Sequence, residues 1–224
     1  MGLLETVARI VQLGGAPARA ARVAALRARW EERTGAFSPE DPWFEERSRA
    51  FWDDAVTAQR FGGDVMDELE ESERAWLGPL ERAHRGLFRV SVEDRDVLED
   101  VWSGAQLVVS TVDEASRAEL DASSGQLFDA RVVGTAGPSL TVALLPGAVF
   151  HSRDATEPIA PVLAAARAQG MSTADTLDAL LRMQRALRSL SRVKPAYAYR
   201  AEALSPRAPA LPHGPVQRPA KAPT

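Results

Sequence analysis

Hydrophobic positions in residues 1–84 recur at helical spacing and predict an α-helical region. Leu3, Val7 and Ile10 share one face of a helix over residues 2–12, and Gly14-Gly15 ends it. Further helices are predicted over residues 17–33, 42–60 and 64–84, the last of them kinked or broken at Gly78-Pro79. Six of the chain's 14 aromatic residues mark the centre of the helical core: Phe37, Trp43, Phe44, Phe51, Trp52 and Phe61.

After Arg85 the spacing of apolar residues changes from about 3.6 to about 2, which predicts β structure. Phe88, Val90 and Val92 alternate with residues of the opposite face. Ser103-Gly104 has the composition of a hairpin turn. Residues 111–125 are predicted to be a polar connection. Strands are predicted near residues 87–92, 97–102, 107–110, 126–133, 140–145 and 148–151.

Helical spacing returns behind Pro158 and predicts a helix that ends at Gly170. Ser172 and Asp175 form a capping-box-like start for a final helix that runs to about residue 190. From Pro195 onward the chain holds seven prolines and almost no bulky aliphatic side chains. Such a segment cannot bury enough surface to offset its ordering entropy, so we expect a disordered tail.

These elements predict an α+β fold, in which a helical N-terminal region packs on a small antiparallel β sheet or barrel. Two C-terminal helices complete the body, and a disordered tail follows. The expected organisation is a helical region over residues 1–84, a β domain over 85–154, C-terminal helices over 155–192 and a basic, proline-rich tail over 193–224.

The composition limits the cellular compartments and the kinds of side-chain chemistry that the sequence is compatible with. The chain has no cysteine, which excludes disulfides and thiol nucleophiles and favours a reducing compartment. Its apolar runs fall far short of the roughly 20 residues that a membrane-spanning helix needs. Residues 3–11 carry two charges where a signal peptide has an apolar core. We therefore expect a cytoplasmic protein with no membrane span.

Charge is distributed unevenly along the chain. The net charge is −4, yet residues 190–224 hold six cations against the single acid Glu202. The body is therefore acidic and the tail basic. Only two of the 27 cationic residues are lysine, which is typical of a high-GC bacterial genome.

Glu81 and His84 have the Glu-x-x-His spacing that places two ligands on one helix face in carboxylate-bridged metal sites. Such a site needs a second copy of the motif, and the sequence has only two other histidines, His151 and His213. We expect His84 to be a helix-end residue near the C-terminal dipole. No metal ligand and no cofactor-binding residue is assigned.

His151, Ser152, Arg153 and Asp154 follow the last predicted strand, a position at which many proteins build sites. Histidine and aspartate are the residue types of hydrolytic catalysis. Neighbours in sequence rarely form a triad, however, and the Gly-x-Ser-x-Gly elbow is absent. Loop and helix-cap roles are favoured, and no catalytic residue is assigned.

Two charged stretches could form interaction surfaces. The acidic residues between Asp64 and Glu73 could bind a cation or a basic partner, although a solvated helix face explains them as well. The five arginines between Arg19 and Arg33 could face anionic lipid, but two glutamates interrupt them. The glycine-rich spots match neither a dinucleotide fingerprint nor a P-loop.

Two resemblances can be stated. Arg117 and Asp121-Ala122-Ser123-Ser124-Gly125 are similar to ligand-binding elements of PilZ-type barrels, with a spacing one residue short and without the paired upstream arginines. Residues 35–165 resemble uncharacterised proteins of high-GC bacteria in the order of Ser38–Glu45, Phe51-Trp52 and Arg85–Phe88. The second resemblance implies an unassigned function and carries over no functional residue.

The sequence favours a non-enzymatic interaction or regulatory protein, adaptor-like, with a protein partner. Its acidic body would present one surface, and its basic, proline-containing tail would supply an adaptable second contact. Two alternatives stay open: a hydrolase-like enzyme with a cleft near His151 and Asp154, and a nonspecific nucleic-acid binder acting through the tail. The acidic β segment disfavours the latter, because it would repel phosphate. The oligomeric state is not predicted.

Overall fold

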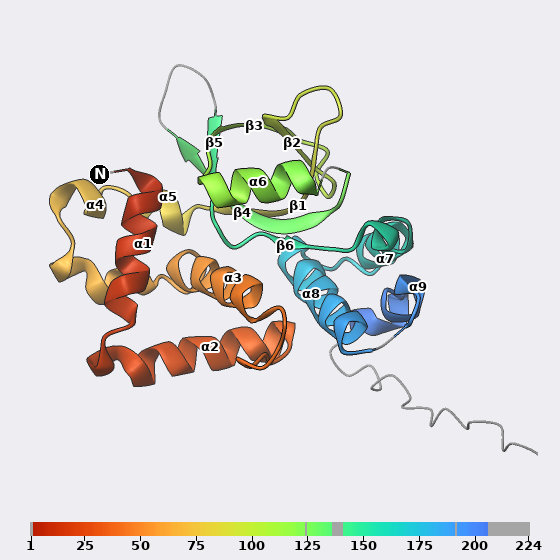
Figure 1. Cartoon of the computed structure of the whole chain (residues 1–224), viewed down its shortest axis with the longest axis horizontal. Helices are drawn as coiled ribbons and strands as arrows, with labels where there is room; N and C mark the ends of the chain where they lie inside the picture. The colour runs from red at the N-terminus through yellow and green to blue at the C-terminus, as the bar shows by residue number, and fades with distance from the viewer. Residues whose placement is uncertain (1, 124, 136–140, 191, 206–224) are drawn as a thin grey trace, which may run out of the picture.

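The computed structural model describes residues 2–123, 125–135, 141–190 and 192–205. It has the predicted α+β architecture, in which a β barrel packs against two groups of helices (Figure 1). The N-terminal group comprises α1 (Leu3–Gly14), η1 (Pro17–Arg19), α2 (Ala20–Thr34), α3 (Phe44–Val56), η2 (Phe61–Glu68), α4 (Glu71–Arg74) and α5 (Leu77–Glu81). The C-terminal group comprises η3 (Arg153–Ala155), α7 (Thr156–Ala168), α8 (Thr173–Ser189), α9 (Pro195–Ala198) and η4 (Ala201–Leu204).

The barrel has five strands in the order β1-β2-β3-β5-β4, and pairing of β1 with β4 closes it. The pair β3–β5 is parallel, so the sheet is not purely antiparallel as the sequence suggested. With a helix, α6, between β3 and β4, this is the topology of an OB-type Greek-key barrel. The strands are β1 (His84–Val90), β2 (Val97–Asp100), β3 (Gln106–Thr111), β4 (Phe128–Thr135), β5 (Thr141–Leu144) and the short β6 (Val149–Phe150), which pairs antiparallel with the start of β4.

Helix α6 (Glu114–Ala122) occupies the segment that was expected to be a polar connection. Asp113 caps it, because its side chain accepts a hydrogen bond of 2.9 Å from the backbone N–H of Ser116. Only Ser116 and Leu120 are buried on this helix. A single buried leucine gives no repeating apolar spacing, so the hydrophobic pattern of the sequence does not predict this helix.

The predicted long helix over residues 64–84 is wrong. Three short helices, η2, α4 and α5, stand in its place, and His84 begins β1 instead of ending a helix. The chain turns sharply before α4, where the Glu73 side chain accepts a 2.7 Å hydrogen bond from the backbone N–H of Glu70. Pro79 lies in the first turn of α5, where its missing N–H has no intrahelical partner to lose.

The expected start of the tail at residue 193 is also wrong. Helices α9 and η4 follow that point, and they bury Ala198, Tyr199 and Leu204 against α7 and α8. Pro195 is the first residue of α9 and starts a helix there, although the prolines that follow it predicted the end of the ordered chain. The tail prediction for residues 206–224 lies outside the described residues.

Three apolar clusters meet at the barrel. Its interior contains Phe88, Leu98 and Phe128, whereas Leu87 points out of the barrel and packs under the C-terminal helices. Strand β1 is therefore buried on both faces, and its sequence does not alternate cleanly. Val92, expected to continue the buried face, is instead fully exposed in the β1–β2 loop. The N-terminal helices pack on a different part of the wall, against Val133, Ala143, Leu145 and Val149.

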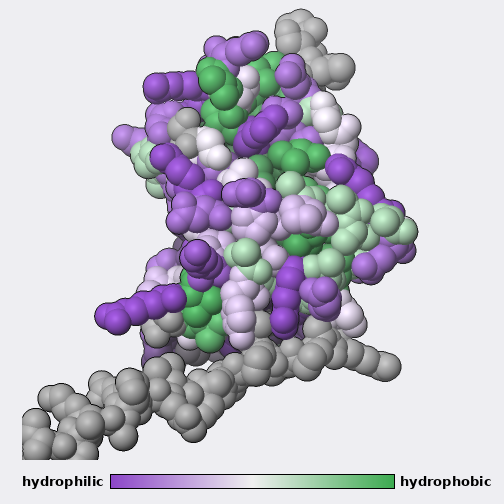
Figure 2. All heavy atoms as spheres, turned by 90° about the vertical axis from the view of Figure 1, so that its right-hand side faces the viewer, coloured by the Kyte–Doolittle hydropathy of each residue, from purple (hydrophilic) through white to green (hydrophobic). Residues whose placement is uncertain are grey.

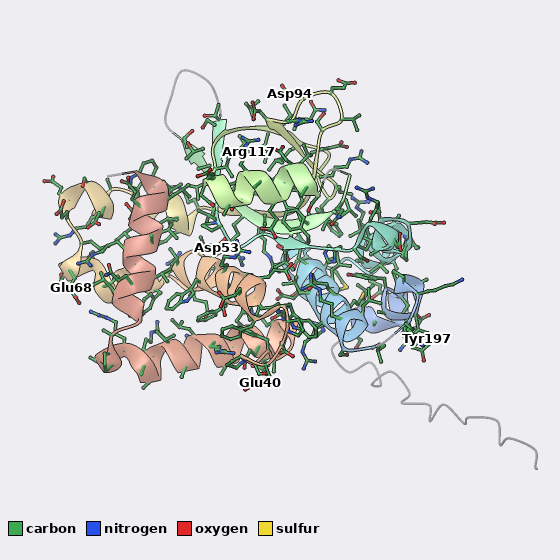
Figure 3. All side chains as sticks on the ribbon, in the orientation of Figure 1. Glu40, Asp53, Glu68, Asp94, Arg117 and Tyr197 are labelled. Atoms are coloured by element: carbon green, nitrogen blue, oxygen red, sulfur yellow. The ribbon has the colours of Figure 1, made fainter. Side chains whose placement is uncertain are left out.

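The turn before β6 approaches α3 so closely that only glycine fits. A Cβ at Gly147 would lie 2.6 Å from the backbone oxygen of Arg49. This approach lets the Gly147 N–H donate a 2.7 Å hydrogen bond to Asp53, which lies between α3 and the barrel (Figure 3). Burial raises the pKa of Asp53 to about 7, although Arg131 and the Gly147 N–H both act to lower it.

Six charged side chains form a closed network between the barrel and the helices. Arg131 of β4 donates to Asp54 of α3 at 2.5 Å, and Arg33 of α2 bridges Asp54 and Asp178 at 2.7 and 2.9 Å. Arg85 of β1 donates to Asp178 at 2.7 Å. It also makes a bidentate pair with Asp129, at 2.6 and 3.0 Å. Asp129 lies on β4, the strand that also carries Arg131, so the network begins and ends on this strand. Three arginines and three aspartates thus join five elements with no net charge.

We expect Asp54→Asn to destabilise the protein by about 3–5 kcal/mol, because it leaves Arg131 and the buried side of Arg33 without their shared counter-ion. Equilibrium denaturation in guanidinium chloride measures this change. Glu99→Gln is the matched control, because Glu99 also makes a bidentate arginine pair, with the half-exposed Arg89. The control variant should unfold near the wild-type midpoint. Similar losses for both variants would contradict a stabilising role specific to the network.

Candidate functional site

A pocket of about 660 Å³ lies between α7 and α9, and we call it the α7–α9 pocket. Its volume is in the range of about 300–1,000 Å³ that is usual for ligand sites. The lining residues come from two segments separated by about 30 residues, and only folding brings them together. They are Asp154, Glu157, Pro158, Pro161, Lys194, Pro195, Ala196 and Tyr199.

Prolines form much of the wall, and each has a local reason for its position. Pro158 lies in the first turn of α7, and Pro195 is the first residue of α9, positions at which a helix does not use the backbone N–H. Pro161 lies inside α7 and has no N–H to donate to the backbone oxygen of Glu157. The result is a rigid wall with fixed backbone angles, and Asp154 and Glu157 are exposed beside it.

Tyr199 completes the wall and is held from behind by His151. The Tyr199 hydroxyl and His151 Nδ1 are 2.6 Å apart, and the two rings meet edge to face at 5.6 Å. Both residues are buried. Burial lowers the pKa of His151 to about 4 and raises the pKa of Tyr199, so both groups are neutral at pH 7.

His151 and Asp154, which the hydrolase hypothesis combined, do not meet through the histidine ring. Nδ1 bonds Tyr199, and Nε2 is buried without a hydrogen-bond partner in the part of the chain that the structure describes. A neutral, enclosed imidazole with a depressed pKa is poorly suited to take a proton from a substrate near pH 7. Its evident role is to position Tyr199. Asp154 instead lines the α7–α9 pocket.

The two side chains of the Glu-x-x-His motif have different partners. Glu81 lies 3.5 Å from Arg60, and His84 Nε2 lies 3.1 Å from Asp100. Among the described residues, no three metal-ligating side chains gather in one place.

The two charged stretches meet at two ion pairs, Arg19 with Glu68 and Arg22 with Asp64. Arg33 belongs to the network, so most of the arginine charge on which the lipid hypothesis depended is paired. The acidic run keeps the exposed carboxylates Asp67, Glu70 and Glu71. Arg117 of the PilZ-like segment lies on α6 and pairs with Asp96 at 2.9 Å.

Two other pockets are lined by side chains that form ion pairs. One of about 500 Å³, beside Trp43, contains Glu46 bonded to Arg188 and Arg49 3.6 Å from Glu119. Burial raises the pKa of Glu119. A third pocket, of about 460 Å³, exposes the Arg33 end of the network. The α7–α9 pocket differs because its walls are mainly apolar.

Comparisons with known proteins give no relative: no family model, curated protein or solved structure matches the chain. None of the helices in the described part combines the length and apolar character that a membrane span requires. Asp154 was a candidate from the sequence, but for hydrolytic chemistry, whereas Pro158 and Pro195 marked boundaries of ordered elements. Pro161, a proline in the middle of a predicted helix, was a signal that sequence reasoning could have used.

We expect His151→Asn to remove a component of the pH dependence of stability. Because the folded pKa of about 4 lies below the unfolded value, the unfolded chain binds a proton first, and stability falls as pH decreases below about 6.5. At pH 5 this loss is about 2 kcal/mol. Between pH 7.5 and 5, wild type should therefore lose about 2 kcal/mol more than the variant, as measured by urea denaturation. Equal losses would show that His151 is not held neutral.

Proposed function

We propose that this is a non-enzymatic interaction protein whose α7–α9 pocket binds an extended, proline-containing, basic segment of a protein partner. The observation that carries the proposal is the combination of rigid proline and tyrosine walls with the exposed acids Asp154 and Glu157. Figure 2 shows the side of the molecule on which α7 and α9 lie, where hydrophobic side chains reach the surface among hydrophilic ones.

The wall chemistry suits a polyproline II ligand. Such segments have a preformed backbone with no internal hydrogen bonds, and they dock in grooves lined by rigid apolar rings. Pro158, Pro161 and Tyr199 lose little conformational freedom when a ligand binds, because their own backbone or packing already fixes them. The two acids of the pocket outnumber its one cation, Lys194, so the local charge favours a cationic ligand.

The alternatives receive less support. Hydrolysis at His151 needs a solvent-accessible imidazole, whereas this one is fully buried and bonded to Tyr199. Nucleic-acid binding gains something from the barrel topology, since OB-type barrels bind oligonucleotides near the β1–β2 loop. Here that loop carries Glu93, Asp94 and Asp96 against Arg95, a balance that disfavours phosphate. We also propose a cytoplasmic location, which the cysteine-free sequence favours.

A charge-reversed pocket tests the proposal. A fluorescein-labelled peptide with proline at every third position and two arginines should bind the full chain, and binding should weaken by at least about fivefold in Asp154→Lys/Glu157→Lys. The same peptide with glutamate in place of arginine should bind wild type more weakly. Fluorescence anisotropy at low salt measures both.

Glu71→Lys/Glu93→Lys is the matched control. It makes the same change in net charge at two exposed positions outside the α7–α9 pocket. If it weakens peptide binding as much as the pocket variant does, the effect comes from net charge, and the pocket is not the site. Absence of binding of either peptide to the wild-type chain at millimolar concentration would overturn the proposal.

A further inference from the structure

The segment that follows Ser205 has the chemistry that the α7–α9 pocket favours. Its prolines include Pro206, Pro209, Pro212 and Pro215, each three residues from the next. A polyproline II helix has three residues per turn, so this spacing would align the four rings along one edge. Residues 206–224 contain three cations (Arg207, Arg218 and Lys221) and no acid. Proline spacing and charge therefore both complement the pocket.

The starting point of this segment is fixed near α7. Leu204 is buried, and its backbone oxygen accepts a 3.1 Å hydrogen bond from Arg182. Leu204 and Met171 line the same small pocket, and Met171 follows the C-terminal end of α7 by three residues. The α7–α9 pocket lies at the opposite, N-terminal end of α7, beside Glu157 and Pro158.

The segment is long enough to reach the pocket. Helix α7 has 13 residues and is therefore about 20 Å long. Residues 206–215 span about 30 Å as a polyproline II helix, at about 3.1 Å per residue. The length of the segment therefore covers the distance from Leu204 back along α7 to the pocket.

We propose that residues 206–224 dock in the α7–α9 pocket of their own chain and compete with the partner there. This inference rests on the proposed function, because it names a regulator of the same site. A tethered ligand has an effective concentration of about 1 mM, so a segment that binds with a Kd of about 100 µM weakens the apparent affinity of a competitor about tenfold. The partner then binds only when it outcompetes the segment or when the segment is held elsewhere.

The test uses the full chain and a variant of its tail, Pro209→Gly/Pro212→Gly/Pro215→Gly. The probe is a fluorescein-labelled synthetic peptide of residues 206–217, and fluorescence anisotropy gives its Kd. The variant should bind the probe about tenfold more tightly than wild type does, because its own tail no longer competes. The control Ala208→Gly/Ala210→Gly adds glycines to the same segment but keeps the prolines, and it should bind like wild type.

The outcomes separate this inference from the proposed function. Equal probe affinity in wild type and the proline variant overturns tail competition, while binding of the arginine peptide still supports the pocket. If the probe binds no chain at all, docking of the tail is overturned directly. A doubled native mass that reverts to monomer in the proline variant would show that the segment docks on a second copy, which overturns competition within one chain.

Discussion

A closed chain of three arginines and three aspartates is the interaction on which the arrangement of barrel and helices depends. It passes from Arg131 through Asp54, Arg33, Asp178 and Arg85, and returns to β4 at Asp129. Each buried charge would cost several kcal/mol of desolvation if left alone, so every member requires its neighbours. Apolar packing can tolerate a sliding helix, whereas these bonds with fixed donor geometry do not.

The network also joins the two helical groups, which pack on each other through α2 and α8. Arg33 of α2 and Asp178 of α8 are 145 residues apart in the sequence and meet beside the barrel. Asp53, next to Asp54 on α3, fixes the turn before β6 through the Gly147 N–H. One helix therefore orients both the network and the strand that leads to His151. His151, which follows β6, is hydrogen-bonded to Tyr199, so the barrel fixes the position of this wall of the α7–α9 pocket.

The structure confirms the predicted fold class. That class could be predicted because apolar periodicity identifies most of the strands and the longer helices, such as α1, α2 and α8. It failed where a different principle decided the structure. Helix α6 depends on the Asp113 cap more than on an apolar stripe, and α9 begins with a proline that looked like a terminator. The network was invisible, because its bonds join residues as far apart as Arg33 and Asp178, and charge patterns predict partners only within a helix. The pocket shares this limitation, since its two walls lie about 30 residues apart.

The number of acids is a poor guide to where the surface is negative. Asp54, Asp129 and Asp178 are neutralised inside, and Glu68 pairs with Arg19. These ion pairs cancel in the net charge, so the excess of acid lies at other positions, and recognition at the pocket depends on its local contacts. A site whose affinity comes from rigid apolar walls and a few exposed charges binds weakly and exchanges quickly. Those are the conditions under which a tethered segment of modest affinity competes effectively with an external partner.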